Sequence, residues 1–294
     1  MSANLESTCL SARNFSTPRL LRALPSLAIV TGVVAMLLAT SGVLQAAPIN
    51  YGNFMGNTVT YIDVTENSGT DPQHYPPNAF PPDPNAGLFG KPIVSGDSLD
   101  FTPINFFAIS DFSVPPFDPT DGHLTFMVAA KPGKAISNIN IEEGGSLRLA
   151  GFGTDVTHVD VAAIGTLGVS EVDGVPISVV NIDINLAFNF GVAGNGTWRL
   201  VSEGIVNGFL WKGSQFIDIK QELINRNIPV NFGATKITVA LDNSLFAASE
   251  QLSGAFIDKK DFGGLNVTVN IPEPGTLVLA SLGLLAGIYR RRSG

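Results

Sequence analysis

Large apolar residues occupy every second position from Val180 to Phe190. The even positions are all apolar, and most of the odd positions are Asn or Asp. Successive side chains of a β-strand point to opposite faces, so a period of two residues indicates a strand. The segment therefore predicts a single strand with one buried face and one polar face.

Shorter stretches with the same period recur along the chain, each bounded by Gly, Asn or Asp. Their apolar positions are Leu124, Phe126 and Val128; Ile139 and Ile141; Leu147 and Leu149; Val159 and Val161; Ile237, Val239 and Leu241; and Val267 and Val269. Many short strands with turn residues between them are typical of two packed antiparallel sheets. The expected fold class is all-β, an antiparallel β-sandwich with one or two short helices.

One segment of the body has a helical period instead. Phe216, Ile219, Leu223 and Ile224 share one face of a helix that follows Ser214, and residues 225–229 would close it. Because no long helical pattern appears elsewhere in the body, a doubly wound α/β fold is excluded.

Proline is concentrated between residues 70 and 119, above all in residues 74–84 and 114–119. Proline lacks an N–H donor and cannot fill a central strand, so this region is expected to form long surface loops. Neither a repeat nor a linker divides residues 48–270. They are expected to form one exported domain.

The N-terminal 47 residues have the pattern of a secretory signal peptide. Arg13, Arg19 and Arg22 precede an uncharged stretch of 22 residues, 23–44, and small residues follow at Ala46 and Ala47. Cleavage after either alanine is expected. The alternative is an uncleaved signal anchor, because 22 residues are long enough to span a membrane. Both interpretations place the body outside the inner membrane.

Residues 271–294 form a second compound signal. Pro272 and Pro274 flank Glu273 and keep the backbone extended, and Thr276 can cap an apolar helix over residues 277–288. The 14 residues 276–289 would give a helix of about 21 Å, which is short for a hydrocarbon core of ~30 Å. Arg290, Arg291 and Arg292 then favour retention of that end on the cytoplasmic side, as a membrane-stop cluster. The alternative is a buried C-terminal core helix.

The order Pro-Glu-Pro, apolar helix and terminal arginines resembles the PEP-CTERM sorting signal of Gram-negative bacteria, with Ile271 where Val is usual. The resemblance implies recognition of Pro272, Glu273 and Pro274 by an exosortase, a membrane-embedded cysteine transpeptidase. It covers about a twelfth of the chain. The tail is also labelled an ice-binding protein C-terminal domain, but the body lacks the regular threonine array that an ice-binding face needs.

Composition agrees with export and excludes some partners. Cys9 is the only cysteine and lies in the expected signal peptide, so the mature chain would contain neither a disulfide nor a cysteine nucleophile. Residues 48–270 contain 11 Lys or Arg and 23 Asp or Glu, a net charge of −12. Such an acidic body argues against nucleic acid and against an anionic membrane face as partners.

Residues that could carry catalysis are few. His74, His123 and His158 are the only histidines; they match no metal-binding spacing, and the chain contains no Gly-x-Ser-x-Gly motif. His158 lies beside Asp155 and Asp160, and His123 follows Asp121 and Gly122. Both histidines are expected on the surface. A catalytic triad assembled from distant positions stays open as an alternative.

Two groups of residues could bind a ligand. Asp111, Asp118 and Asp121 lie in one Pro-rich region and could hold Ca²⁺, although turn-forming aspartates explain them as well. The polar face made by Asn181, Asp183, Asn185 and Asn189 could hydrogen-bond sugar hydroxyls, with Trp198 or Trp211 stacking on a pyranose ring. The alternative is the solvated side of a sheet.

The sequence thus predicts an exported, non-enzymatic protein without a cofactor. It would be processed by an exosortase, tethered transiently to the membrane by its C-terminal helix, and sorted to the cell surface or an extracellular polysaccharide matrix. A carbohydrate-binding module is the alternative from another class. A secreted hydrolase is the third.

Overall fold

The computed structural model describes residues 48–67, 87–103, 105–111, 116–260 and 266–270. All of them belong to one compact unit. The expected signal peptide, His74, the Pro-Glu-Pro motif, the apolar run of the tail and Arg290, Arg291 and Arg292 lie outside the described residues. Among those residues no helix is both long and apolar enough to cross a membrane.

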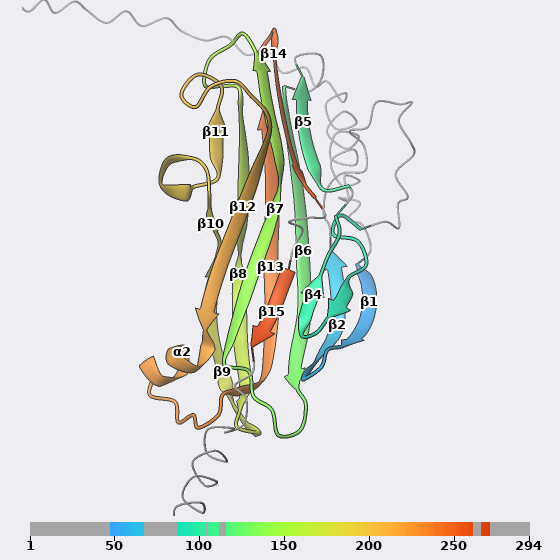
Figure 1. Cartoon of the computed structure of the whole chain (residues 1–294), viewed down its shortest axis with the longest axis vertical. Helices are drawn as coiled ribbons and strands as arrows, with labels where there is room; N and C mark the ends of the chain where they lie inside the picture. The colour runs from blue at the N-terminus through green and yellow to red at the C-terminus, as the bar shows by residue number, and fades with distance from the viewer. Residues whose placement is uncertain (1–47, 68–86, 104, 112–115, 261–265, 271–294) are drawn as a thin grey trace, which may run out of the picture. The chain divides into compact units, whose positions relative to one another are not determined.

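Two antiparallel sheets face each other (Figure 1). Sheet A contains seven strands in the order β1-β2-β6-β13-β8, with β9 and β11 both paired to the remaining edge of β8. Its strands are β1 (Ile49–Met55), β2 (Val59–Asn67), β6 (Phe117–Ala130), β13 (Ala234–Ala248), β8 (His158–Val172), β9 (Val175–Asn185) and β11 (Thr197–Arg199).

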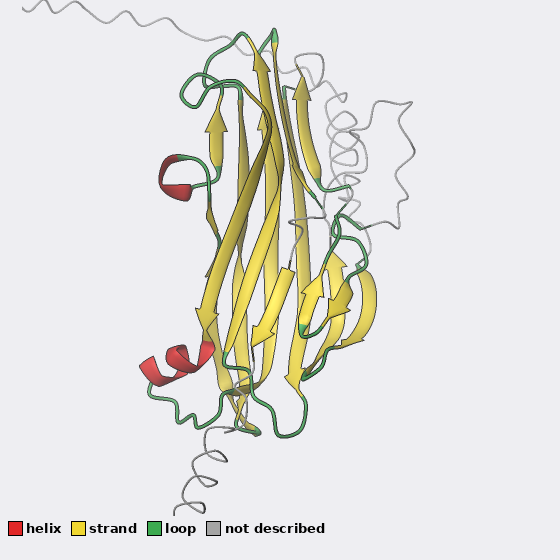
Figure 2. Ribbon diagram, viewed as in Figure 1, coloured by secondary structure: helices red, strands yellow, loops and turns green. Residues whose placement is uncertain are grey.

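Sheet B contains eight strands and is built around β7, which pairs with β12 on one side and with β14 and β15 on the other. Its strands are β10 (Ala187–Phe188), β12 (Val206–Asp218), β7 (Asn138–Gly151), β15 (Asn266–Asn270), β14 (Ser253–Lys259), β5 (Phe107–Asp111), β4 (Ser98–Asp100) and β3 (Ile93–Ser95). The described helices are the 3₁₀ helix η1 (Val192–Gly194) and the α-helix α2 (Ile219–Asn225). Strands therefore dominate the described chain (Figure 2). The expectation of an all-β fold is confirmed.

The core lies between the two sheets, where the alternation of apolar and polar residues predicts it. The apolar positions of the predicted strands in β6, β7, β8 and β13 are buried and form one hydrophobic cluster. Its largest side chains include Trp211, Tyr61, Phe89 and Phe126. The sandwich is therefore held mainly by burial of apolar surface.

A buried ion pair interrupts this apolar core. Lys259 on β14 donates to Glu143 on β7 at 2.6 Å, and both side chains are fully buried. The Lys259 ammonium also donates to Asn243 of β13 and lies 4.9 Å from the Phe106 ring centroid. Burial raises the pKa of Glu143 and lowers that of Lys259, while the pairing opposes both shifts. The pair thus lies within sheet B at a cost in desolvation, and the hydrogen bond from Lys259 to Asn243 links it to sheet A.

The segment from Val180 to Phe190 is two strands rather than the predicted single one. Residues up to Asn185 belong to β9 in sheet A, whereas Ala187 and Phe188 form β10 in sheet B. The alternation continues through the crossing because Ile184, Leu186 and Phe188 point into the same core from both sheets. Periodicity alone cannot distinguish one long strand from two that change sheet.

The predicted helix exists but is shorter than expected. β12 continues to Asp218, whose side chain caps α2 by accepting from the Gln221 N–H at 2.9 Å. Ile219 and Leu223 are buried, while Phe216 lies on β12 and is 61% exposed. The helix therefore begins at Ile219, because Asp218 is a better N-cap than a residue inside a paired strand.

The Pro-rich region is also more regular than expected. β3, β4 and β5 lie within it, and Pro119 is part of β6, opposite Phe246 of β13. Proline is tolerated there because β2 pairs only with residues 123–130 of β6, so no strand among the described residues pairs with the other side of β6 at Pro119.

Candidate functional site

Three of the four residues proposed for a glycan face lie together on the outer side of sheet A. Asn181, Asp183 and Asn185 are exposed on β9 and alternate with the buried Ile182 and Ile184. Asn189 lies elsewhere, beyond β10. Its side-chain oxygen accepts from the Lys212 N–H on β12 at 2.8 Å, so it belongs to sheet B.

Side chains from sheet B and α2 close the outer edge of β9. Gln215 accepts from the Asn185 N–H at 2.6 Å and donates to the Asp183 carbonyl at 3.2 Å. Arg226 donates to the Asn181 carbonyl at 2.6 Å. The backbone edge is therefore occupied, and the side chains of β9 remain available to solvent.

The strand register extends this polar face across sheet A. Asp183 lies opposite Thr166 of β8, which lies opposite Ala240 of β13. Ala240 in turn lies opposite Thr125, and Thr125 opposite Thr65 of β2. The result is a row of short side chains across five strands, most of which can donate or accept hydrogen bonds.

A histidine and aspartate pair lies in the neighbouring row of the same face. His123 Nδ1 and Asp242 Oδ1 are 2.5 Å apart, and their side chains are 36% and 62% exposed. One row further, burial and then the charge of Asp242 raise the pKa of Asp121. His158 pairs with Asp160 at 3.2 Å, and its other ring nitrogen lies 2.7 Å from the Val156 carbonyl. Both histidines lie on the surface, as predicted.

The three aspartates proposed for Ca²⁺ do not form a common site. Asp118 is buried and accepts from the Ile109 N–H at 2.8 Å, Asp121 lies on the outer face of sheet A, and Asp111 lies on β5 of sheet B. No group of three His, Cys, Asp or Glu suited to a metal ion occurs in the described ranges.

Neither tryptophan is placed to stack on a sugar at the polar face. Trp211 is 1% exposed and donates to the Asp258 carbonyl at 3.1 Å. Trp198 is part-buried, donates to the Gly204 carbonyl at 2.9 Å and lies 4.9 Å from Phe209 between ring centroids. Both indoles serve packing. Exposed aromatic rings occur instead at one end of the outer face of sheet A, where Phe117, which is 54% exposed, stacks on Phe246.

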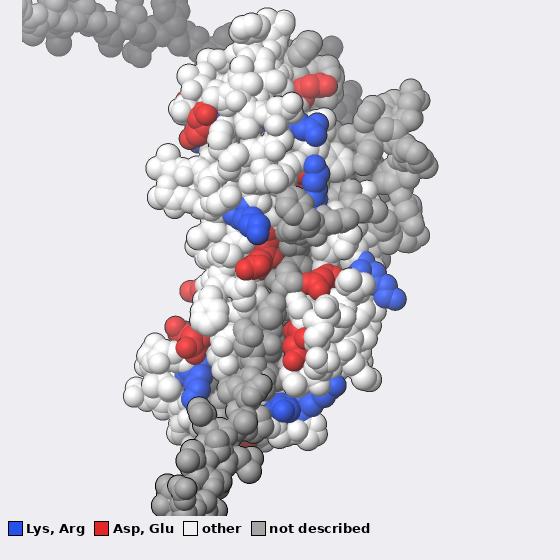
Figure 3. Space-filling view, viewed as in Figure 1, with Lys and Arg blue, Asp and Glu red and all other residues white. Residues whose placement is uncertain are grey.

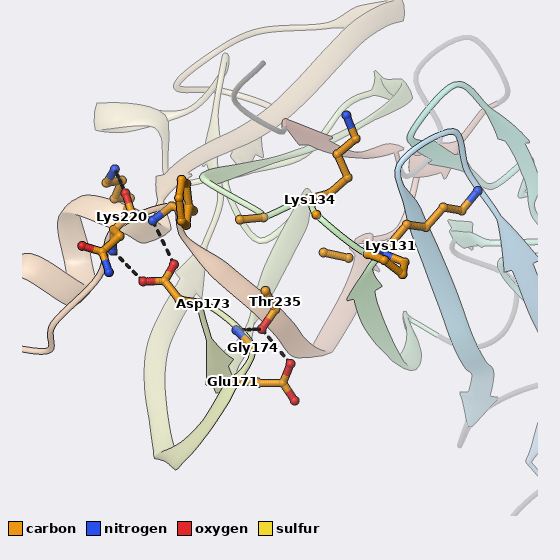
Figure 4. A pocket seen from close by; sticks show the side chains of 13 residues that line it. Lys131, Lys134, Glu171, Asp173, Gly174, Lys220 and Thr235 are labelled. Carbon is orange, nitrogen blue, oxygen red and sulfur yellow. Dashed lines mark hydrogen bonds between the residues drawn. The ribbon is translucent and has the colours of Figure 1, made fainter. Parts of the chain in front are cut away.

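A cavity of about 690 Å³ opens at the end of the sandwich where β6 joins β7 (Figure 4). It is lined by three lysines, Lys131, Lys134 and Lys220, by Glu171 and Asp173, and by apolar groups that include Pro132, Ala135 and Phe232. Lys131 and Lys220 donate to the carbonyls of Gly56 and Asn231 at 2.6 and 2.7 Å. Sequence reasoning missed this cavity, because its lysines lie on three segments that no local pattern connects.

Comparisons with known proteins identify only the tail. Residues 270–293 match the family model of the PEP-CTERM protein-sorting motif. The expected resemblance is thereby confirmed, and the motif implies export and membrane-associated sorting by exosortase, a membrane enzyme. No curated protein matches the chain.

Two solved structures are similar to the chain at low TM-scores. The family 11 xylanase from Neocallimastix patriciarum is 11% identical with a TM-score of 0.19, over 76% of this chain and 99% of that one. A loop-swap mutant of the Xyn11A enzyme from the same organism is 9% identical with a TM-score of 0.17, over 74% and 94%. TM-scores this low support no conclusion about the fold or activity of this chain.

Proposed function

We propose that the protein is an exported, non-enzymatic surface protein, held at the membrane by its tail until exosortase acts on Pro272-Glu273-Pro274. The observation that carries this proposal is the sorting motif at residues 270–293. The short apolar run and Arg290, Arg291 and Arg292 support transient tethering. The signal-like residues 1–47 support the same direction of export.

The position of the motif favours access by a membrane enzyme. β15 ends at Asn270, and Pro272 follows two residues later. Asn270 lies opposite Asn138, the first residue of β7. The motif therefore begins where the paired sheet ends, and processing there would leave the sandwich intact.

Changing Pro272 and Pro274 together to alanine should abolish processing in a host that has the exosortase. The physical reason is that the two prolines fix an extended backbone around Glu273. Immunoblots of membrane, surface and medium fractions should show the full-length chain accumulating at the membrane. A control with the exposed Pro176 and Pro229 changed to alanine should be processed normally. Unchanged size and location of the first variant would refute the sorting proposal.

Carbohydrate binding by the outer face of sheet A is a second candidate for the body. It is favoured by the register, which places Asn181, Asp183 and Asn185 beside Thr166, in and next to a row of short side chains. Amide and carboxylate groups in such a row match the hydroxyls of a sugar chain. Asn189, which lies in sheet B, and the stacking role of the tryptophans are not part of this candidate.

Glycan-array binding followed by calorimetry tests this candidate. Changing Asn181 and Asn185 together to alanine should weaken binding about tenfold or more, because each lost hydrogen bond contributes ~0.5–1.5 kcal/mol. Asn207→Ala on the exposed side of β12 in sheet B is the matched control and should bind normally. Undiminished affinity in the double variant would remove this face from consideration.

A further inference from the structure

The sorting tail leaves the sandwich at the end that carries the cavity. β15 runs antiparallel to β7, so its last residue, Asn270, lies opposite the first residue of β7. The loop that precedes β7 supplies Lys131 and Lys134 to the cavity. α2 adjoins the same loop, because the Lys220 N–H donates to the Ser137 carbonyl at 3.0 Å. We call this region, residues 131–138, 171–174 and 218–236, the tail end.

The chain between β15 and the apolar run is short. Only residues 271–275 separate Asn270 from Thr276, and a fully extended chain of that length spans less than about 20 Å. The headgroup region adds roughly 5–8 Å on each side of the hydrocarbon core. With the apolar run inserted, the tail end is therefore held within reach of the lipid headgroups.

The charge of the tail end differs from that of the rest of the body. Its segments contain five Lys or Arg and four Asp or Glu, whereas residues 48–270 as a whole contain 11 and 23. Figure 3 shows Lys and Arg side chains near the lower end of the visible face, where Figure 1 places α2 and the end of β6. Nearly half of the cations thus lie where an anionic membrane would attract them.

The acidic groups in the cavity are held by hydrogen bonds and an ion pair within the protein. The Asp173 carboxylate accepts from the N–H groups of Asn231, Phe232 and Gly233 at 2.6, 2.8 and 3.1 Å. Burial alone would raise the pKa of Asp173, but these hydrogen bonds lower it on balance, so the carboxylate stays ionised with its oxygens occupied by donors of the protein itself. Glu171 accepts from Thr235 at 2.7 Å and pairs with Lys236 at 3.5 Å.

The lysines of the cavity have hydrogen-bond donors that no described residue uses. Each ammonium has three donors, and Lys131 and Lys220 each use one on a backbone carbonyl. No partner for the Lys134 ammonium occurs among the described residues. Beside these cations lie Pro132, which is exposed, and Phe232, whose side chain is 71% exposed. Cations next to exposed apolar groups suit the boundary between phosphates and acyl chains.

We propose that the tail end is a docking site for anionic phospholipid headgroups, with Lys134 and Lys220 facing the phosphates. The proposal rests on the proposed function, since it needs the tail to hold the body at the membrane. It goes beyond that function by giving the body a fixed orientation, with the tail end toward the lipid.

The test uses the mature chain, residues 48–294, in nanodiscs, with a single fluorophore on Pro132→Cys. Residues 1–47 are left out because their apolar stretch could insert by itself. Nitroxide placed on the lipid headgroups should quench this fluorophore strongly in discs of phosphatidylcholine with 30% phosphatidylglycerol, and several-fold less in phosphatidylcholine alone. A fluorophore on Phe152→Cys, in the loop after the opposite end of β7, should be quenched little in either.

Charge reversal provides the matched comparison. Lys134→Glu with Lys220→Glu should weaken contact with anionic discs about tenfold or more, because each lysine near such a surface contributes about fivefold. Lys91→Glu with Lys212→Glu makes the same change in net charge away from the tail end and should have little effect. Salt at 0.5 M should reproduce the loss.

The outcomes separate the two proposals. Equal quenching at position 132 in both lipids, or equal loss in the two charge-reversed variants, would overturn docking while co-elution with the discs still upholds anchoring. Failure of the chain to co-elute with either disc would overturn the anchoring step and the docking that depends on it.

Discussion

Lys259→Met will lower the free energy of unfolding by about 3–5 kcal/mol, because it leaves the buried Glu143 carboxylate without its counter-ion. Both side chains of the pair are fully buried, and the ammonium also bonds Asn243 on the opposite sheet. Urea unfolding followed by tryptophan fluorescence gives the measurement, since Trp211 lies in the core. A loss below 1 kcal/mol would show that the pair is not buried as described.

The double variant Glu143→Leu with Lys259→Met is the control. Removing both charges also removes the desolvation cost, so most of the lost stability should return. In the single variant the pKa of Glu143, already raised by burial, rises further above its ordinary value of 4.5 because Lys259 no longer lowers it. The folded state then binds more protons than the unfolded state above pH 4.5. The single variant should therefore lose stability as pH rises from 5 to 8, relative to the double variant.

Gly145→Ala will destabilise the protein by about 3 kcal/mol. A Cβ on Gly145 would overlap the carbonyl oxygen of Asp258 and lie 2.7 Å from its carbon, so the backbone of β14 would have to move. Overpacking against backbone is costly because no flexible side chain can yield. Urea unfolding again provides the measurement.

Gly254→Ala on β14 is the matched control for this glycine. An added Cβ there meets only the Ser110 carbonyl oxygen, at 3.7 Å, which is ordinary contact. Its stability should stay within about 0.5 kcal/mol of the parent or rise slightly, because alanine restricts the unfolded chain more than glycine does. Equal losses at the two positions would argue against the close approach of β7 and β14.

The alternation of residues predicted the core well but could not assign strands to sheets. Ile184 and Phe188 obey one period although they belong to different sheets, because both sheets bury side chains in the same core. At Pro119 the error was the opposite one, because a residue of β6 was predicted to lie in a surface loop. Proline forbids a central strand position, and the sequence alone does not reveal that β2 stops before reaching it.

For the candidate sites, the sequence could predict residues that share one strand but not residues that the fold brings together. Asn181, Asp183 and Asn185 could be found from the sequence because one strand carries them, whereas their neighbour Thr166 becomes visible only through the register. The fourth residue of that set, Asn189, was misplaced because the chain changes sheet before it. The cavity at the tail end needed the full fold, since Lys134 and Lys220 are 86 positions apart.

The placement of β15 also has a mechanical consequence. β15 lies between β7 and β4, hydrogen-bonded to both, and the tail continues directly from its last residue. A pull along the axis of β15 would therefore shear the hydrogen bonds on both sides together rather than open them one at a time. We therefore expect β15 to resist unfolding when force is applied along its axis through the tail.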